Sequence, residues 1–193
     1  MKILVDRLND SPQPFEFEAG SAWWRAAVPA DPELPRELDE PLRLAVSAYR
    51  VGDDLIVDGQ VVGRVPLQCA RCLARYGHEL REVFRLVLEP AGERVPADPE
   101  GADGLARYGM CVAEELETGW YRGSEIDLSG FVHELICLAL PVKPLCREEC
   151  AGLCPRCGAD RNAGPCGCPE PAGDDSPFAV LKALRDGTGG GRS

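Results

Sequence analysis

The chain has 193 residues, of which 45% are hydrophobic and 27% charged, as is ordinary for a soluble globular protein with a core of its own. Its longest apolar run, Ile136 to Val142, is far shorter than the roughly 20 residues that span a bilayer. The opening MKILVDRLND lacks the apolar stretch of a secretory signal. We therefore expect a cytoplasmic protein without a membrane partner, in which thiols stay reduced.

The net charge of −11 is unevenly distributed. Residues 1–142 carry 14 Lys and Arg against 25 Asp and Glu, whereas residues 143–193 carry seven of each. An acidic body disfavours broad contact with nucleic-acid phosphates, which depends on Lys and Arg. It favours basic proteins as partners, although an acidic surface can also serve solubility alone.

Strand patterns dominate the first hundred residues. Residues 42–51 and 54–69 alternate apolar and polar side chains around a turn at Gly52, Asp53 and Asp54, which predicts a hairpin. Residues 78–90 alternate in the same way, and MKILVDRL and PFEFEA are shorter candidate strands. Two Pro-rich stretches, VPADPELP and EPAGERVPADPEGADG, are predicted to be loops.

Two segments have helical spacing. Residues 127–140 place apolar side chains on one face after Asp127, a candidate N-cap, and Pro141 ends the pattern. Residues 176–187 form a second, shorter candidate, followed by a tail expected to be disordered. The predicted fold class is α+β: an antiparallel sheet or partial barrel with one packed helix (residues 1–142), a cysteine-rich zinc module (143–170), and a short helix with a tail (171–193).

Eight of the ten cysteines form four close pairs: Cys69/Cys72, Cys146/Cys150, Cys154/Cys157 and Cys166/Cys168. Two pairs have the C-x-x-C spacing, in which a tight turn lets two thiolates face one metal ion while backbone N–H groups stabilise their charge. Disulfides conflict with a reducing compartment, and no C-x-x-C opens a helix as a thioredoxin-like centre requires. The pattern predicts thiolate-bound zinc.

Three pairings of these units are possible. Joining Cys154/Cys157 to Cys166/Cys168 closes only the loop GADRNAGP, so this pairing has the smallest entropic cost of loop closure. It leaves Cys69/Cys72 to pair with Cys146/Cys150. Because C-x-C is a less usual spacing, a single zinc site with spare thiols also remains open. Cys111 and Cys137 stand outside the pairs, and Cys137 is expected to be a small buried or boundary side chain of the helix.

The predicted zinc is structural. Four thiolates fill the coordination shell, and a catalytic zinc needs an open position. His78 and His133 have no recognisable catalytic partner, and the chain has no phosphate loop, dinucleotide fingerprint, nucleophile elbow or H-E-x-x-H motif. We expect neither an enzyme nor a small-molecule substrate.

The order of these pieces resembles a known family. QCARC after a hairpin, a helix running into LALPVKPLC, then CAGLCPRCG and a closing SPFAVLKAL are similar to the YceD-like family, the large ribosomal RNA subunit accumulation proteins. The resemblance covers about Leu42 to Leu184. It implies that Cys69/Cys72 and Cys146/Cys150 belong together. Arg161 stands where that family usually has leucine, so the resemblance does not carry over an apolar contact of that loop.

The resemblance also implies a bacterial, cytoplasmic, non-enzymatic factor in ribosome biogenesis that supports 23S rRNA accumulation. Two mechanisms follow. The acidic body could bind a basic large-subunit ribosomal protein or a preribosomal particle, which we favour. Alternatively, Lys143, Arg147, Arg156 and Arg161 could contact rRNA directly, but these few cations lie beside as many as eight thiolates. A zinc-stabilised adaptor unrelated to ribosomes is a third hypothesis.

Overall fold

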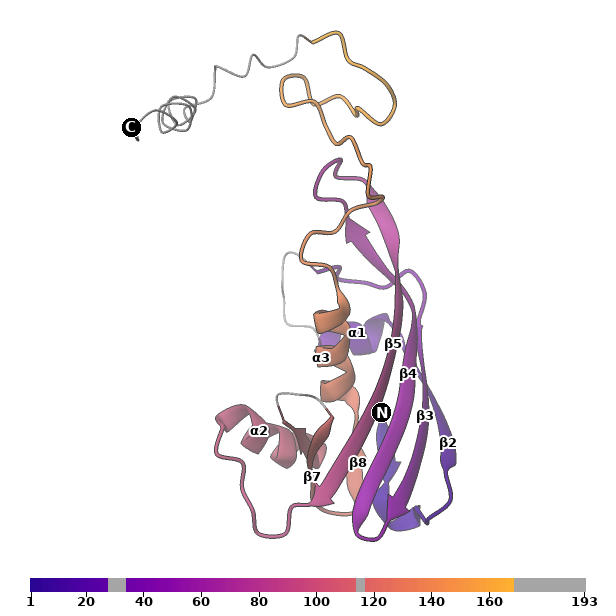
Figure 1. The fold of residues 1–193 in the computed structure, drawn as a ribbon, viewed down its shortest axis with the longest axis vertical. Helices are drawn as coiled ribbons and strands as arrows, with labels where there is room; N and C mark the ends of the chain where they lie inside the picture. The colour runs from indigo at the N-terminus through magenta and orange to yellow at the C-terminus, as the bar shows by residue number, and fades with distance from the viewer. Residues whose placement is uncertain (28–33, 114–116, 169–193) are drawn as a thin grey trace, which may run out of the picture. The chain divides into compact units, whose positions relative to one another are not determined.

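A computed structural model describes residues 1–27, 34–113 and 117–168 (Figure 1). The predicted helix at 176–187 and the tail lie outside these residues. Within them, no helix combines the length and apolar character required to cross a membrane. The chain divides into two compact units, Met1–Cys150 and Ala151–Ser193. The three-part division predicted from the sequence stays a prediction.

Three long antiparallel strands form the centre of the first unit (Figure 1). They are β3 (Leu42–Val51), β4 (Asp54–Gln68) and β5 (Arg75–Pro90). The predicted hairpin is confirmed, since β3 and β4 pair from Val51↔Asp54 to Arg43↔Val62 around the turn at Gly52, where φ is +64°. Strands β4 and β5 continue the ladder through fourteen residue pairs up to Gln68↔Arg75. The next connection, residues 69–74, carries the first cysteine pair.

The described part of the sheet has six strands in the order β2-β3-β4-β5-β7-β6. The flanking strands are β2 (Gln13–Ala19), β6 (Met110–Val112) and β7 (Thr118–Tyr121). The sheet is open rather than a closed barrel, and β7 pairs with β5 in parallel, unlike the other strands. A separate pair joins β1 (Lys2–Leu4) to β8 (Glu125–Asp127). The α+β class predicted from the sequence is confirmed.

Helices lie on one face of the curved sheet (Figure 1). They are α1 (Ser21–Ala27), α2 (Pro99–Tyr108) and α3 (Ser129–Ala139), with a short 3-10 turn η1 (Val5–Arg7) after β1. Phe131 of α3 packs edge-on against Phe84 of β5, with ring centroids 4.9 Å apart. Trp24 of α1 is fully buried, and its indole N–H donates to the Pro35 carbonyl at 2.6 Å. Burial of this apolar face holds the helices on the sheet.

Two helix predictions need correction. Among the described residues, the body has two helices, α1 and α2, beyond the one expected, and α2 begins inside a stretch predicted to be a loop. Asp98 caps that helix by accepting from the Gly101 N–H, Pro99 occupies its first turn, and Gly109 ends it with φ +68°. In α3, Leu128 rather than Asp127 is the N-cap residue. The Asp127 carboxylate nevertheless accepts from the Ser129 N–H at 2.9 Å, so it satisfies the same helix end.

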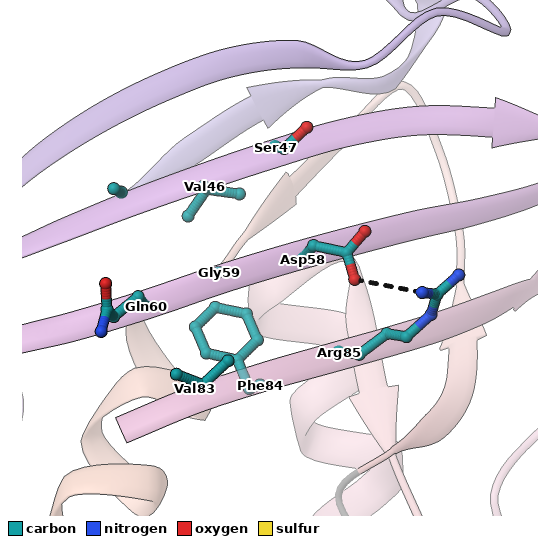
Figure 2. A pocket seen from close by; sticks show the side chains of 9 residues that line it. Val46, Ser47, Asp58, Gly59, Gln60, Val83, Phe84 and Arg85 are labelled. Carbon is teal, nitrogen blue, oxygen red and sulfur yellow. Dashed lines mark ion pairs between the residues drawn. The ribbon is translucent and has the colours of Figure 1, made fainter. Parts of the chain in front are cut away.

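The face of the sheet opposite the helices is exposed to solvent. A shallow hollow of about 570 Å³ lies there, and Asp58 of β4 forms an ion pair with Arg85 of β5 across 3.6 Å. Figure 2 shows the side chains that line it and this ion pair. The floor of the hollow passes over Gly59, where the ring of Phe84 occupies the space that a Cβ would need. The hollow is a gap between rows of side chains and holds no cluster of reactive groups.

Candidate metal centres

The first cysteine cluster lies where the β4–β5 hairpin meets the segment after α3. The turn between the two strands supplies Cys69 and Cys72, and the later segment supplies Cys146 and Cys150. All four sulfurs lie within 4.8 Å of one another. The Ala70 N–H also donates to the Pro144 carbonyl at 2.8 Å, so the backbone joins the same two segments. The cluster therefore fastens elements that are far apart in the sequence.

The turn that presents Cys69 and Cys72 has a defined hydrogen-bond frame. The Leu73 N–H donates to the Cys69 carbonyl at 2.9 Å, and the Cys69 N–H donates to the Ala74 carbonyl at 2.9 Å. The Arg71 N–H points at the Cys69 sulfur at 3.4 Å. Leu73 must adopt φ +60° to close this frame, the left-handed region that favours glycine.

The second cluster lies wholly in the second unit and uses the same frame. Its sulfurs, all within 4.8 Å of one another, belong to Cys154, Cys157, Cys166 and Cys168. The Gly158 N–H donates to the Cys154 carbonyl at 2.9 Å, and the Cys154 N–H donates to the Ala159 carbonyl at 2.8 Å. Gly158, at φ +72°, takes the position that Leu73 holds in the first turn. The two turns are thus equivalent in backbone structure.

A polar loop closes the second cluster. Leu153 and Asp160 form an antiparallel bridge, and the Asp160 carboxylate accepts from the Asn162 N–H at 2.9 Å. The Asn162 side chain accepts in turn from the Ala151 N–H at 2.8 Å. Arg161 is exposed, and its backbone N–H donates to the Gly152 carbonyl at 2.9 Å. Hydrogen bonds rather than an apolar residue at position 161 therefore order this loop.

In each cluster one thiol has an acidic pKa and another a basic one. Burial raises the pKa of Cys69, but N–H groups of Cys72, Cys146 and Arg71 outweigh it and lower the pKa to about 6. In the second cluster, N–H groups of Cys157 and Arg156 lower the pKa of Cys154 to about 6.

In each cluster another cysteine has a raised pKa. Burial, together with its cysteine neighbours, raises the pKa of Cys146 to about 12, and hydrogen bonding to Cys157 raises that of Cys168 to about 12. One thiolate forms readily in each cluster, while four together need a cation.

Two observations test whether zinc fits. A tetrahedral zinc with bonds of about 2.3 Å separates its sulfurs by about 3.8 Å. The Cys69–Cys150 and Cys72–Cys146 sulfurs are 3.8 and 3.7 Å apart. The second is a buried polar atom, the Tyr76 hydroxyl: burial raises its pKa, and the charges of the neighbouring Cys69 and Cys146 raise it further. A metal-bound thiolate would accept a hydrogen bond from this hydroxyl, so the residues fit the ion.

Sequence reasoning missed two supporting residues, Tyr76 and Arg71. The Arg71 guanidinium donates to the Glu148 and Cys150 carbonyls at 3.2 and 2.9 Å, which ties the turn to the second ligand pair. The C-x-R-C repeat at CARC and CPRC was the available signal for Arg71. No sequence pattern around Tyr76 indicates that it lies beside this cluster, because its position there depends on contacts between segments that are far apart in the chain.

The other cysteines and both histidines lie outside the clusters. His78 is in β5, and Cys111 is in β6. On α3 the sulfur of Cys137 lies 3.3 Å from Nε2 of His133, one helical turn away. Burial lowers the pKa of His133 and raises that of Cys111. Cys137 is half-buried, as expected of a boundary side chain.

Fold and site together define a mixed α+β protein with an open sheet and two four-cysteine clusters that could each hold a metal ion. The family model described as large ribosomal RNA subunit accumulation protein YceD matches residues 57–185. The match includes all eight clustered cysteines, and the chain belongs to this family.

Curated relatives are similar over part of their length. An uncharacterised protein of Mycobacterium leprae is 29% identical over 126 residues, which cover 63% of this chain and 50% of that one. Another from Mycobacterium bovis is 31% identical over 121 residues, covering 61% and 50%. A chloroplastic homologue of Arabidopsis thaliana, named large ribosomal RNA subunit accumulation protein YCED homolog 1, is 28% identical over 140 residues, covering 66% and 44%.

The chain therefore spans about half the length of the curated relatives it matches. No solved structure is significantly similar to it.

Proposed function

We propose that the protein is a non-enzymatic, cytoplasmic factor that supports accumulation of 23S rRNA by binding a basic large-subunit ribosomal protein or an assembly intermediate. In this proposal residues 1–142 form the acidic binding body, residues 143–170 the zinc module, and residues 171–193 a terminal helix and tail. The family supplies the link to large-subunit rRNA. The acidic excess of residues 1–142 is the observation that carries the choice of partner.

We assign one structural zinc ion to each cluster. Cys69, Cys72, Cys146 and Cys150 bind the first, and Cys154, Cys157, Cys166 and Cys168 bind the second. Four thiolates leave no open coordination position for water or substrate, so each ion stabilises its fold and performs no chemistry. Each four-thiolate zinc carries a net charge of −2, which adds to the acidity of the protein.

Electrostatics supports a protein partner over naked RNA. A cationic ribosomal tail is attracted to the acidic body, and this attraction raises its encounter rate and weakens with salt. An RNA phosphate chain is repelled by the same charges. Two cations near the first cluster are also engaged within the fold, since Arg71 donates to backbone carbonyls and Arg75 pairs with Asp39 at 3.7 Å.

The test is affinity purification of the tagged protein from growing cells, with and without RNase. Ribosomal proteins retained after RNase treatment are expected. Capture that depends on RNA would instead favour direct RNA binding through Arg156 and Arg161. A gel shift with 23S rRNA fragments alone separates the two. Tight binding at physiological salt, lost in Arg156→Glu/Arg161→Glu, would overturn the choice of a protein partner.

A further inference from the structure

The first unit has a groove of about 840 Å³ between helices α2 and α3 and strand β6. Both helices are labelled in Figure 1. The buried side chains of Met110 and Phe131 form its base. Leu138 lies along it with 68% of its surface exposed. A large exposed aliphatic side chain beside an apolar groove is typical of a binding surface.

The wall of the groove formed by α2 includes two glycines beside the side chains of Glu100 and Tyr108. Gly101 and Gly104 lie three residues apart on this helix and both line the groove. Glycine inside a helix costs about 0.5–1 kcal/mol relative to alanine. Gly101 has a structural reason, because a Cβ there would press on the Asp98 cap. Gly104 lies against strand β6, where a Cβ would be 3.4 Å from the Met110 carbonyl oxygen and 3.8 Å from the Cβ of Cys111, so the close approach of α2 to β6 favours a small residue there.

Carboxylates surround this apolar base. The lining residues include four acidic side chains, Asp98, Glu100, Asp127 and Glu134, and no Lys or Arg. The N-terminal amine of Met1 neutralises Asp127 at 2.9 Å, which leaves three negative charges. Glu100 and Glu134 are exposed, and neither has an ion pair within the described residues.

Two cations close to this region are engaged elsewhere. Arg107 pairs with Asp103 at 3.5 Å, and the guanidinium of Arg122 donates to the Arg94 carbonyl at 2.6 Å. An occupant of the groove must therefore bring its own positive charge beside apolar side chains.

We propose that this groove binds an apolar segment bearing Lys or Arg from the basic protein partner, an inference that rests on the proposed function. The apolar side chains of the segment cover Met110, Phe131 and Leu138, and its cations face Glu100 and Glu134. A polyanion is excluded by the same carboxylates. Figure 2 offers a contrast, because the hollow on the opposite face of the sheet pairs its one carboxylate, Asp58, with Arg85.

The groove contains its own reporters. Cys111 and Cys137 line it, and they are the two cysteines outside the clusters. In the zinc-loaded full chain these two thiols are the ones open to alkylation, so their protection measures occupancy. The probes are purified basic large-subunit ribosomal proteins, tested one by one, and a 23S rRNA fragment. Iodoacetamide labelling of each cysteine is followed by mass spectrometry, and the Kd is measured in parallel.

At least one ribosomal protein is expected to slow labelling of Cys111 and Cys137 at least fivefold. Glu100→Lys/Glu134→Lys should weaken its Kd at least tenfold. Glu16→Lys/Glu18→Lys is the matched control: it makes the same charge change on exposed residues of the edge strand β2, and should weaken the Kd less than threefold. Leu138→Ser should also weaken binding without changing the charge.

Each other result overturns the inference. Tight binding of a ribosomal protein without protection of Cys111 and Cys137, or equal effects of the two charge reversals, removes the groove and leaves the proposed function standing. Protection of these thiols by the RNA fragment would show that the groove accepts a polyanion. No binding of any ribosomal protein overturns both the groove and the proposed function.

Discussion

Removing one zinc should destabilise the acidic body, whereas removing the other should leave it intact. The first perturbation is Cys72→Ser/Cys146→Ser, and the second is Cys157→Ser/Cys166→Ser. All four cysteines are at least partly exposed, so serine itself adds little strain. The two pairs differ in what they hold together: Cys72 and Cys146 are 74 residues apart in the chain, and Cys157 and Cys166 are nine apart.

The expected magnitude follows from loop closure. A cross-link reduces the conformational entropy of the unfolded chain, and this stabilises the folded state by about 4.4 kcal/mol for a 74-residue loop and by about 2.6 kcal/mol for a nine-residue loop. The first of these stabilises the unit Met1–Cys150, and the second stabilises only Ala151–Ser193. We therefore expect the free energy of unfolding of the body to fall by about 3–4 kcal/mol in the first variant. In the second it should change by less than about 0.5 kcal/mol.

Urea unfolding followed by tryptophan fluorescence measures this directly. The three tryptophans of the chain, Trp23, Trp24 and Trp120, all belong to the first unit, so the signal reports on the body alone. Cys111→Ser, outside both clusters, is the control for loss of a thiol. Elemental analysis should find one zinc fewer in each double variant. Equal destabilisation of the body by both variants would refute the assignment of cysteines to clusters.

Three further predictions concern the metal and the backbone. The protein purified under reducing conditions should contain close to two zinc ions per chain, and iron–sulfur absorbance or absence of zinc would contradict the thiolate sites. Leu73→Gly should raise the free energy of unfolding by up to about 1 kcal/mol, since it relieves a left-handed leucine, whereas Leu73→Val should lower it by about 1 kcal/mol or more. Gly59→Ala should lower the free energy of unfolding by about 1–3 kcal/mol, because the added Cβ would overlap the Phe84 ring. Gly77→Ala is the control: the nearest atom to its added Cβ is 3.5 Å away, and the free energy of unfolding should change by less than about 0.5 kcal/mol. Similar urea midpoints for the two variants would disprove the overlap.

Local signals predicted the centre of the fold well. Alternation and a turn at Gly52 specify the β3–β4 hairpin, because side-chain period and turn geometry together fix the register. The start of α2 could not be distinguished from a loop, because Asp and Pro are favoured both in turns and at helix starts. The parallel pairing of β5 with β7 depends on contacts between distant segments, and no local pattern contains it.

The candidate site was predictable to a similar depth. Spacing alone selected the eight cysteines and favoured the grouping that the structure brings together. Leu73 could not be recognised, because leucine carries no signal for a left-handed backbone; the strain is evident from its φ of +60° and from its equivalence to Gly158. The groove beside α3 could not be predicted from the sequence either. Its negative charge comes from carboxylates on separate elements, which lie close together only because α2 packs near α3.

The two clusters bear on partner choice as well as on stability. A backbone frame that directs N–H groups at Cys69 and Cys154 favours a thiolate at each of them, and a zinc ion bound by four thiolates would leave each site with a charge of −2. The guanidinium of Arg71, the cation nearest in sequence to Cys72, donates hydrogen bonds to the Glu148 and Cys150 carbonyls. The Arg71 side chain therefore helps to hold the two ligand segments of the first cluster together. Because residues 1–142 carry 25 Asp and Glu against 14 Lys and Arg, the partner that we propose is a cationic protein segment rather than a phosphate chain.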